Sequence, residues 1–265
     1  TASIFLVKEI STGTKYAMKI SRDLTNIDSE YRVLSRLKEI KFIPGVYYRD
    51  DCIIEGIPHF FFIMSYYKGK NLKEICSEKE IGIKGILQAV LILANICCQL
   101  NKYNIYYCDL KPENLIFDYS SGRLYLVDFG GIARKGEGIS HYTPFFDRGS
   151  WGRGERIADE GYQIFALSMI LVDLLIGRKD KGDRDFLKLI HIIKNSYLCK
   201  NIKRVIIEGL EQKCKNLSTY RNKLLLLIEE VEKGKLQDER KIESAINLCF
   251  VLSLVVFCIV LAMIN

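Results

Sequence analysis

The chain has 265 residues, of which 49% are apolar and 27% charged, so it can bury a sizeable core and wholesale disorder is excluded. Four prolines and 19 glycines without an internal repeat exclude collagen-like and low-complexity proteins. The formal net charge of +7 is small and scattered, so we expect no nucleic-acid partner. Nine cysteines occur without a C-x-x-C pair, which argues against a zinc site and indicates reduced thiols.

The first part of the chain is rich in predicted strands. Apolar runs at residues 4–7 and 15–20 flank the turn-forming residues 11–14, and they predict an antiparallel hairpin. A helix is predicted over residues 26–37, because apolar side chains recur there at spacings of four and three. The apolar run at residues 59–65 predicts a buried strand.

The later part of the chain is mainly helical by prediction. Helices are expected at residues 86–99, 162–176, 186–193 and 224–231. Short strands are expected at residues 115–117 and 124–127. A small strand-rich part followed by a larger helical part predicts an α+β architecture.

An uncharged apolar segment occupies residues 245–264, near the end of the chain. Twenty helical residues span roughly 30 Å, which is the hydrocarbon thickness of a bilayer. A buried core helix is the alternative, but such a helix is rarely this long and uniformly apolar at a chain end. Basic residues in the linker 233–244 precede the segment. We therefore expect a single-pass membrane protein, with the lipid bilayer as a partner and residues 1–244 in the cytoplasm.

The most informative stretch is residues 107–114, which read YCDLKPEN. Asp109 and Asn114 flank a tight turn with Lys111 between them, and Asp128 follows a later strand in the triplet D-F-G. Carboxylate and amide oxygens at adjacent strand ends can hold Mg²⁺, which prefers oxygen ligands. A separate aspartate and lysine can then act on a hydroxyl and a phosphate. Each piece alone is common on protein surfaces, but their conjunction is specific.

Together these pieces resemble the eukaryotic-type (Hanks-type) serine/threonine protein kinase family, whose H-R-D-L-x-x-x-N pattern is followed by D-F-G. The resemblance covers about residues 1–230 in the family's order. Upstream, YAMK at residues 16–19 resembles the V-A-I-K strand, and IMSY at residues 63–66 resembles the hinge. Downstream, ALSMIL at residues 166–171 resembles the buried αF helix.

The resemblance implies a bilobal protein-kinase-like fold. A small antiparallel-sheet N-lobe with one αC helix would occupy residues 1–67, and a larger, mainly α-helical C-lobe would occupy residues 68–232. A basic juxtamembrane linker at residues 233–244 and the transmembrane helix at residues 245–264 would follow.

The resemblance also implies a reaction, the transfer of the γ-phosphoryl group of ATP to a serine or threonine hydroxyl of a protein substrate. Such catalysis is mostly positioning and charge stabilisation. Asp109 would orient the substrate hydroxyl, and Lys111 would neutralise the γ-phosphate. Asn114 and Asp128 would bind Mg²⁺.

A second set of residues would bind the nucleotide, as the resemblance implies. Lys19 would contact the α- and β-phosphates, held in place by an ion pair with Glu30. Taken alone, these two residues read more simply as a surface lysine and a solvated helix carboxylate, and the kinase motifs reverse that preference. The residues implied around the adenine are Ile4, Ala17, Met64 as the gatekeeper, Ser65, Tyr66, Tyr67 and Ile116.

The sequence departs from the family pattern near the nucleotide and before the catalytic aspartate. Counting back from Lys19, Ala2 falls at the third glycine of the glycine-rich loop, so we expect the chain to begin inside that loop. Tyr107-Cys108 replaces His-Arg. Tyr107 can stack against Phe129, whereas a thiol at Cys108 cannot clasp a phosphorylated activation loop. We therefore expect activity that does not depend on activation-loop phosphorylation.

Two further departures fall in the substrate platform. No A-P-E triplet is evident, and Asp147 or Glu155 is expected to serve as the acidic anchor for a later arginine, Arg221. Gln163 stands where the family has the αF aspartate, with Asp159 nearby.

The function we expect is that of a membrane-anchored, ATP- and Mg²⁺-dependent serine/threonine protein kinase. The first alternative is a nucleotide-binding pseudokinase that acts as a signalling or scaffold module, which Tyr107-Cys108 and the missing A-P-E favour. The complete set of six polar site residues opposes it. The second alternative is a small-molecule phosphotransferase, which the intact L-K-P-E sequence after Asp109 opposes.

Overall fold

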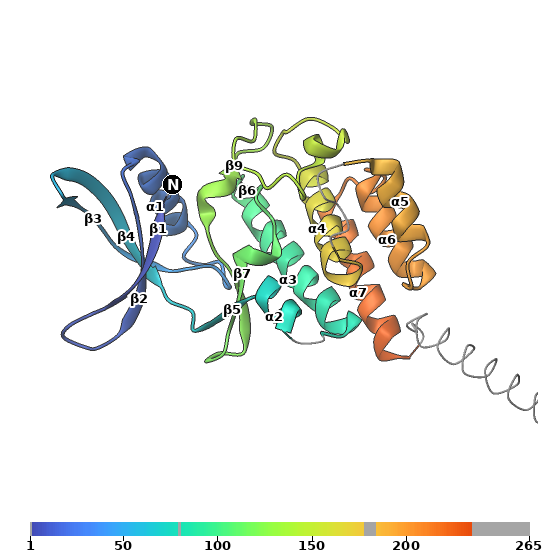
Figure 1. Ribbon diagram of the computed structural model, residues 1–265, viewed down its shortest axis with the longest axis horizontal. Coiled ribbons are helices and arrows are strands. Elements are labelled where there is room, and N and C mark those ends of the chain that lie inside the picture. The colour runs from blue at the N-terminus through green and yellow to red at the C-terminus, as the bar shows by residue number, and fades with distance from the viewer. Residues whose placement is uncertain (1, 79–80, 178–183, 235–265) are drawn as a thin grey trace, which may run out of the picture.

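The computed structural model describes residues 2–78, 81–177 and 184–234 of the chain. A strand-rich N-terminal part and a helical C-terminal part lie side by side along the long axis of the molecule (Figure 1). This is the expected arrangement of a small sheet lobe followed by a larger helical lobe.

The N-terminal part is a four-stranded antiparallel sheet with one helix packed against it. The strand order is β1-β2-β4-β3, and the strands are β1 (Ser3–Lys8), β2 (Lys15–Ser21), β3 (Val46–Ile54) and β4 (Ile57–Ser65). Alternate residues of a strand face opposite sides of the sheet. In β2, Ala17 and Lys19 lie on the buried side, where Lys19 stands opposite Phe62 of β4.

Helix α1 (Leu24–Arg36) brings a carboxylate to the buried side of this sheet. Asp23 caps the helix, since its side chain accepts a hydrogen bond from the Asn26 backbone N–H at 3.1 Å. The buried residues of α1 recur at the spacing of one helix face, and they are Ile27, Glu30 and Leu34. Glu30 therefore stands in an otherwise apolar stripe, where its charge requires a partner.

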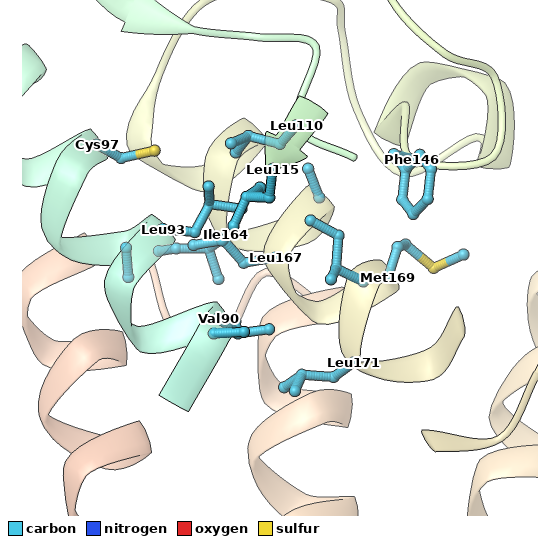
Figure 2. Close-up of a cluster of buried hydrophobic side chains, with 14 of the residues drawn as sticks. Val90, Leu93, Cys97, Leu110, Leu115, Phe146, Ile164, Leu167, Met169 and Leu171 are labelled. Atoms are coloured by element: carbon cyan, nitrogen blue, oxygen red, sulfur yellow. The ribbon is translucent and has the colours of Figure 1, made fainter. Parts of the chain in front are cut away.

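The C-terminal part is built around a helix that is buried on nearly every side. Its helices are α2 (Leu72–Glu78), α3 (Ile83–Lys102), α4 (Glu160–Leu175), α5 (Phe186–Lys194), α6 (Lys200–Leu210) and α7 (Leu217–Glu232). Helix α4 is mostly apolar and almost fully buried, which is typical of a helix at the centre of a core. Helices α3, α6 and α7 pack against it. Figure 2 shows Leu93 of α3 beside Ile164 and Leu167 of α4 in this core.

Short strands and turns carry the chemically important residues. Strands β5 (Gly69–Asn71), β7 (Leu115–Asp118) and β8 (Arg123–Leu126) form one sheet, and β6 (Tyr106–Tyr107) pairs with β9 (Ile132–Ala133). Single 3₁₀ turns lie at Pro112–Asn114, Phe129–Gly131 and Arg148–Trp151. Because β7 pairs with β8 and β6 pairs with β9, residues 107–114 are brought alongside residues 128–131.

Most of the predicted elements form with ends that differ by a few residues, although α7 begins at Leu217 rather than at residue 224. The elements that were not predicted are β3, β5, β6, β9, α2 and α6. Strand β3 carries an exposed charged run at residues 49–51, which interrupts the apolar pattern by which strands are recognised. In α6, basic residues at 200, 203 and 204 obscured an amphipathic spacing. The buried residues of α6 are Ile202, Val205, Ile206, Gly209 and Leu210.

Helix α3 is, among the described residues, the one helix long and apolar enough to cross a membrane. Half of its apolar window is buried inside the C-terminal part, where it packs against α4 and α7. Core helices meet the same criteria of length and composition, so we assign α3 to the core. The expected membrane helix at residues 245–264, and the linker from residue 235 onward, lie outside the described residues.

We expect Gly209→Ala to destabilise the protein, although alanine normally favours a helix over glycine by about 1 kcal/mol. A Cβ at Gly209 would lie 2.1 Å from Ser168 Oγ and 3.1 Å from Tyr220 Cε2. Overpacking of this kind costs about 1–3 kcal/mol, measurable by urea denaturation followed through Trp151 fluorescence. Gly82→Ala is the control, since a Cβ there meets nothing within 4 Å. A Gly209→Ala protein more stable than the wild type would contradict the close packing of α4 and α6.

Candidate active site

A buried lysine joins the sheet, helix α1 and the segment after β8. The Nζ of Lys19 lies 2.6 Å from Glu30 Oε2 and 2.7 Å from Asp128 Oδ1. Lys19 is 8% exposed and Glu30 is 4% exposed. The backbone N–H of Phe129 donates to the second oxygen of Glu30 at 2.9 Å. Strand β2, helix α1 and the segment after β8 are therefore fixed to one another by charge-assisted hydrogen bonds.

The charges of Lys19 and Asp128 stabilise one another, whereas burial outweighs Lys19 at Glu30 and raises the pKa of that carboxyl. Burial by itself would lower the pKa of the Lys19 ammonium, but the carboxylates of Glu30 and Asp128 outweigh burial and raise it. Burial would raise the pKa of Asp128, but the neighbouring ammonium of Lys19 outweighs it and lowers that pKa. Lys19 and Asp128 are therefore both charged at neutral pH.

Tyr107 holds the backbone of the D-F-G triplet. Its hydroxyl lies 2.8 Å from the carbonyl oxygen of Val127 and 3.0 Å from that of Asp128, and it accepts a bond from Asn114 Nδ2 at 2.9 Å. Its ring contacts that of Phe129 as expected, but edge-on rather than stacked, with centroids 5.5 Å apart. Burial raises the pKa of Tyr107 well above its usual value, so the hydroxyl stays protonated and can donate.

Asp128 has a left-handed backbone, with φ of 63°. This conformation costs free energy in a residue other than glycine and persists only where the surroundings fix it. Here the Tyr107 hydroxyl contacts its carbonyl, and Lys19 binds its side chain. The orientation of the Asp128 carboxylate is therefore set by contacts on both of its sides.

Asp109 and Lys111 form a second polar cluster. Lys111 Nζ lies 2.5 Å from Asp109 Oδ2, and the Thr143 hydroxyl donates to Asp109 Oδ1 at 2.7 Å. Asn114 donates to the backbone carbonyl of Asp109 at 3.0 Å. Gly131 allows its backbone to lie close to Asp109, since a Cβ at residue 131 would lie 2.6 Å from the Cβ of Asp109. The sequence did not predict the contact of Thr143 with Asp109.

A cavity of about 550 Å³ connects the two clusters. All the residues expected around the adenine line it: Ile4, Ala17, Met64, Ser65, Tyr66, Tyr67 and Ile116. Lys19, Glu30, Asp109 and Asp128 also line it, whereas Lys111 and Asn114 do not line it but bond to Asp109. Residues that the sequence did not single out include Pro44, Val127 and His141. Apart from the D-F-G neighbour Val127, they lie in loops without a recognisable motif.

The donor set available for a metal ion consists of oxygen atoms from two residues. Within the described residues, no three histidine, cysteine, aspartate or glutamate side chains gather as a metal site. Asn114 directs its amide nitrogen to Tyr107 and to the Asp109 carbonyl, which leaves its oxygen for a cation. Asp128 uses one oxygen for Lys19. These two residues suit a hard cation such as Mg²⁺ that takes its other ligands from water or phosphate.

The activation segment, residues 132–158, folds back on itself through a short backbone ladder. The hydrogen bonds run from Gly136 N–H to Ala158 O (2.8 Å), from Ala158 N–H to Glu137 O (2.9 Å), and from Ile139 N–H to Arg156 O (2.9 Å). Backbone hydrogen bonds therefore hold residues 136–139 against residues 156–158.

Cys108 anchors an apolar cluster beneath this ladder. Ile139 and Ala158 of the activation segment pack with Cys108, Tyr106 and Tyr162. Burial raises the pKa of the Cys108 thiol to about 12, so it is neutral at physiological pH. Cys108 therefore contributes apolar packing at a position where the family pattern has a positive charge.

Asp147 is the buried acidic anchor of the activation segment, but its partner is not the expected one. It pairs with Arg156, whose Nε lies 2.8 Å away, and it accepts hydrogen bonds from Ser150 and Tyr162. Burial would raise the pKa of Asp147, but the hydrogen bonds outweigh burial and lower it. Arg221 bonds to its neighbour on α7 instead. The expected pairing was wrong because the arginine comes from the same loop.

A second ion pair ties this loop to the start of α4. The guanidinium of Arg148 makes two 2.8 Å hydrogen bonds to the carboxylate of Asp159, and its Nε donates to the Glu155 carbonyl. Glu155 thus contributes its backbone rather than a carboxylate. Gln163, at the expected αF position, donates to the Tyr107 carbonyl at 3.4 Å and supports the catalytic loop.

The sequence is similar to those of known protein kinases. The protein kinase domain family matches residues 1–238. The serine/threonine-protein kinase YabT of Bacillus subtilis is 30% identical over 213 residues, which cover 78% of this chain and 62% of YabT. The CBL-interacting serine/threonine-protein kinase 19 of Arabidopsis thaliana is 24% identical over 238 residues, covering 80% of this chain and 47% of that protein.

A third relative, the serine/threonine-protein kinase VHS1 of Saccharomyces cerevisiae, is 27% identical over 144 residues, covering 48% of this chain and 31% of that protein. The chain thus spans less than two thirds of the length of each of these relatives. Since the family match extends over most of the chain, the protein belongs to the protein kinase domain family.

Proposed function

We propose that this protein is an active kinase that transfers the γ-phosphoryl group of ATP to serine or threonine hydroxyls of proteins. The observation that carries the proposal is that both polar clusters are assembled around one cavity. Lys19 is held between Glu30 and Asp128, while Asp109 is held by Lys111 and Thr143. A preorganised arrangement of this kind is what phosphoryl transfer requires, since it depends on positioning and on charge stabilisation.

The cavity suits a nucleotide in size and in chemistry. Its volume of about 550 Å³ lies within the usual range of small-molecule sites. Apolar residues such as Ala17 and Ile116 suit a base at one end, and Lys19 suits phosphates at the other. Asp128 and Asn114 would hold Mg²⁺ through oxygen, and the bound ion would neutralise phosphate charge.

The remaining residues would act on the acceptor. Asp109 would accept a hydrogen bond from the substrate hydroxyl and orient its oxygen toward the transferred group. The existing bond from the Thr143 hydroxyl supports this role, because it places a hydroxyl against the same carboxylate. Lys111 would supply positive charge beside the group in transfer.

We expect Asp109→Asn and Lys19→Met to lose at least about 100-fold in phosphoryl transfer, as is typical when a group that moves a proton or stabilises charge is removed. The measurement is incorporation of labelled phosphate from Mg-ATP into the protein and into a generic serine/threonine substrate. Lys188→Met, which changes an exposed lysine on α5, is the matched control. Equal incorporation by the wild type and both variants would show that this site does not catalyse the reaction. Nucleotide binding without transfer by the wild type would favour the pseudokinase.

We also propose that activity does not depend on phosphorylation of the activation segment. The backbone ladder supports this proposal, because it holds residues 136–139 in place without a phosphate. The neutral thiol of Cys108 packs under the ladder and offers no charge to which a phosphate could bind.

Phosphatase-treated wild type should therefore keep its initial rate within about twofold, with removal of phosphate verified by mass spectrometry. Tyr142→Phe should behave in the same way, because the ring that lies 4.4 Å from the Arg156 guanidinium is retained. Thr143→Ala is not a clean test, since its hydroxyl bonds to Asp109. A large loss of rate after dephosphorylation, recovered on rephosphorylation, would refute the proposal.

We further propose that residues 245–264 form a single membrane-spanning helix with the kinase domain on the cytoplasmic side. The sequence supports this, because the segment carries no charge and follows the basic residues Lys233, Lys235, Arg240 and Lys241. Helix α7 ends at Glu232, so only residues 233–244 separate the domain from the segment.

The protein should accordingly stay in the membrane pellet during extraction with alkaline carbonate. Replacing both Val255 and Val256 by arginine should release it, since each arginine at the centre of a span costs about 2.5–3.5 kcal/mol. Extraction of the wild-type protein by carbonate would rule out a spanning helix.

A further inference from the structure

His141 lies in the wall of the cavity, together with Asp109, Gly130 and Gly131. The backbone on either side of it is anchored. Two residues earlier, Ile139 is buried and its N–H bonds to the Arg156 carbonyl. Two residues later, the Thr143 hydroxyl bonds to Asp109. The imidazole itself is exposed, so its position is fixed while its ring remains accessible to a bound molecule.

A neighbouring hydroxyl orients the protons of this ring. The Oγ of Ser140 lies 3.0 Å from Nδ1 of His141. When the serine hydroxyl donates this bond, the neutral imidazole carries its proton on Nε2. Within the described part of the chain, Nε2 of His141 makes no hydrogen bond. In that tautomer the ring presents a free N–H donor to the cavity beside Asp109.

The other positive groups of the site are already paired with carboxylates. Lys19 is held by Glu30 and Asp128, and Lys111 is held by Asp109. The transferred phosphoryl group must lie near Asp109 and Asp128, which both line the cavity and carry negative charge. An anionic group placed there gains from a donor that is not committed to a carboxylate, and His141 is such a donor.

We propose that His141 donates a hydrogen bond from Nε2 to the terminal phosphoryl group of the bound nucleotide. This inference rests on the proposed kinase function and extends it to selectivity between a nucleoside triphosphate and a diphosphate. The contact concerns the terminal group because His141 lines the cavity only two residues before Thr143, whose hydroxyl bonds to the catalytic Asp109. A diphosphate lacks that group and gains nothing from the imidazole.

The test is the affinity of the full chain in detergent for Mg-ATP and Mg-ADP, measured by isothermal titration calorimetry. His141→Ala should weaken ATP binding by about tenfold, the usual effect of losing a hydrogen bond to a charged group. ADP binding should change by less than about twofold. His141→Gln should recover part of the loss, because its amide retains an N–H donor. His191→Ala, which removes an exposed histidine on α5, is the matched control.

The outcomes separate this inference from the function on which it rests. A wild-type protein that binds neither nucleotide would reject both. If both nucleotides bind, and His141→Ala weakens both equally or neither, the kinase proposal stands and the role of His141 is refuted. A variant that alters only the KM for the protein substrate would assign the imidazole to the acceptor, which also refutes the inference.

Discussion

Lys19 lies between two carboxylates, Glu30 and Asp128, in a place almost closed to water. A buried ammonium is unfavourable unless it is paired, and removing one partner of such a cluster leaves an uncompensated charge. The sheet supplies Lys19, helix α1 supplies Glu30, and the D-F-G turn supplies Asp128. The position of the helix and the orientation of Asp128 are therefore linked, and the geometry of the whole cavity depends on this cluster.

The second constraint is the activation segment, which is held by apolar packing and by hydrogen bonds of its own backbone. The ladder between residues 136–139 and 156–158 lies above the thiol of Cys108. Two arginine–aspartate pairs then brace the following turn, Arg156 with Asp147 and Arg148 with Asp159. These contacts offset the absence of the family's arginine and of its A-P-E triplet.

Much of the site could be predicted from the sequence because its residues belong to motifs with fixed spacing. Lys19, Glu30, Asp109 and Asp128 occur in short patterns, and the structure brings them to one cavity. The partner of Asp147 could not be predicted in this way. Several arginines follow it, and which one reaches it depends on the path of the loop. Arg221 was chosen from the family's pattern, whereas Arg156 is nearer along the chain and is the partner found.

Some elements of the fold could likewise be predicted from the sequence, and others could not. Strongly periodic or uniformly apolar segments such as α3 and α4 were predicted, because burial alone explains their pattern. Strand β3 and helix α6 carry charged residues on their exposed sides, and their apolar residues are recognised only once the neighbouring elements are known. The contact of Thr143 with Asp109 is likewise tertiary, since 34 residues separate them.

The placement of the Phe129 ring has a consequence for small-molecule inhibitors. The ring is fully buried beside Tyr107, and the backbone N–H of the same residue bonds to Glu30. A compound that occupies the position of the Phe129 ring would have to break two interactions. These are the hydrogen bond from the Phe129 backbone to Glu30 of α1 and the ring contact with Tyr107. A compound that fits the existing cavity leaves both interactions intact. The structure therefore favours inhibitors that fit this cavity over inhibitors that displace the Phe129 ring.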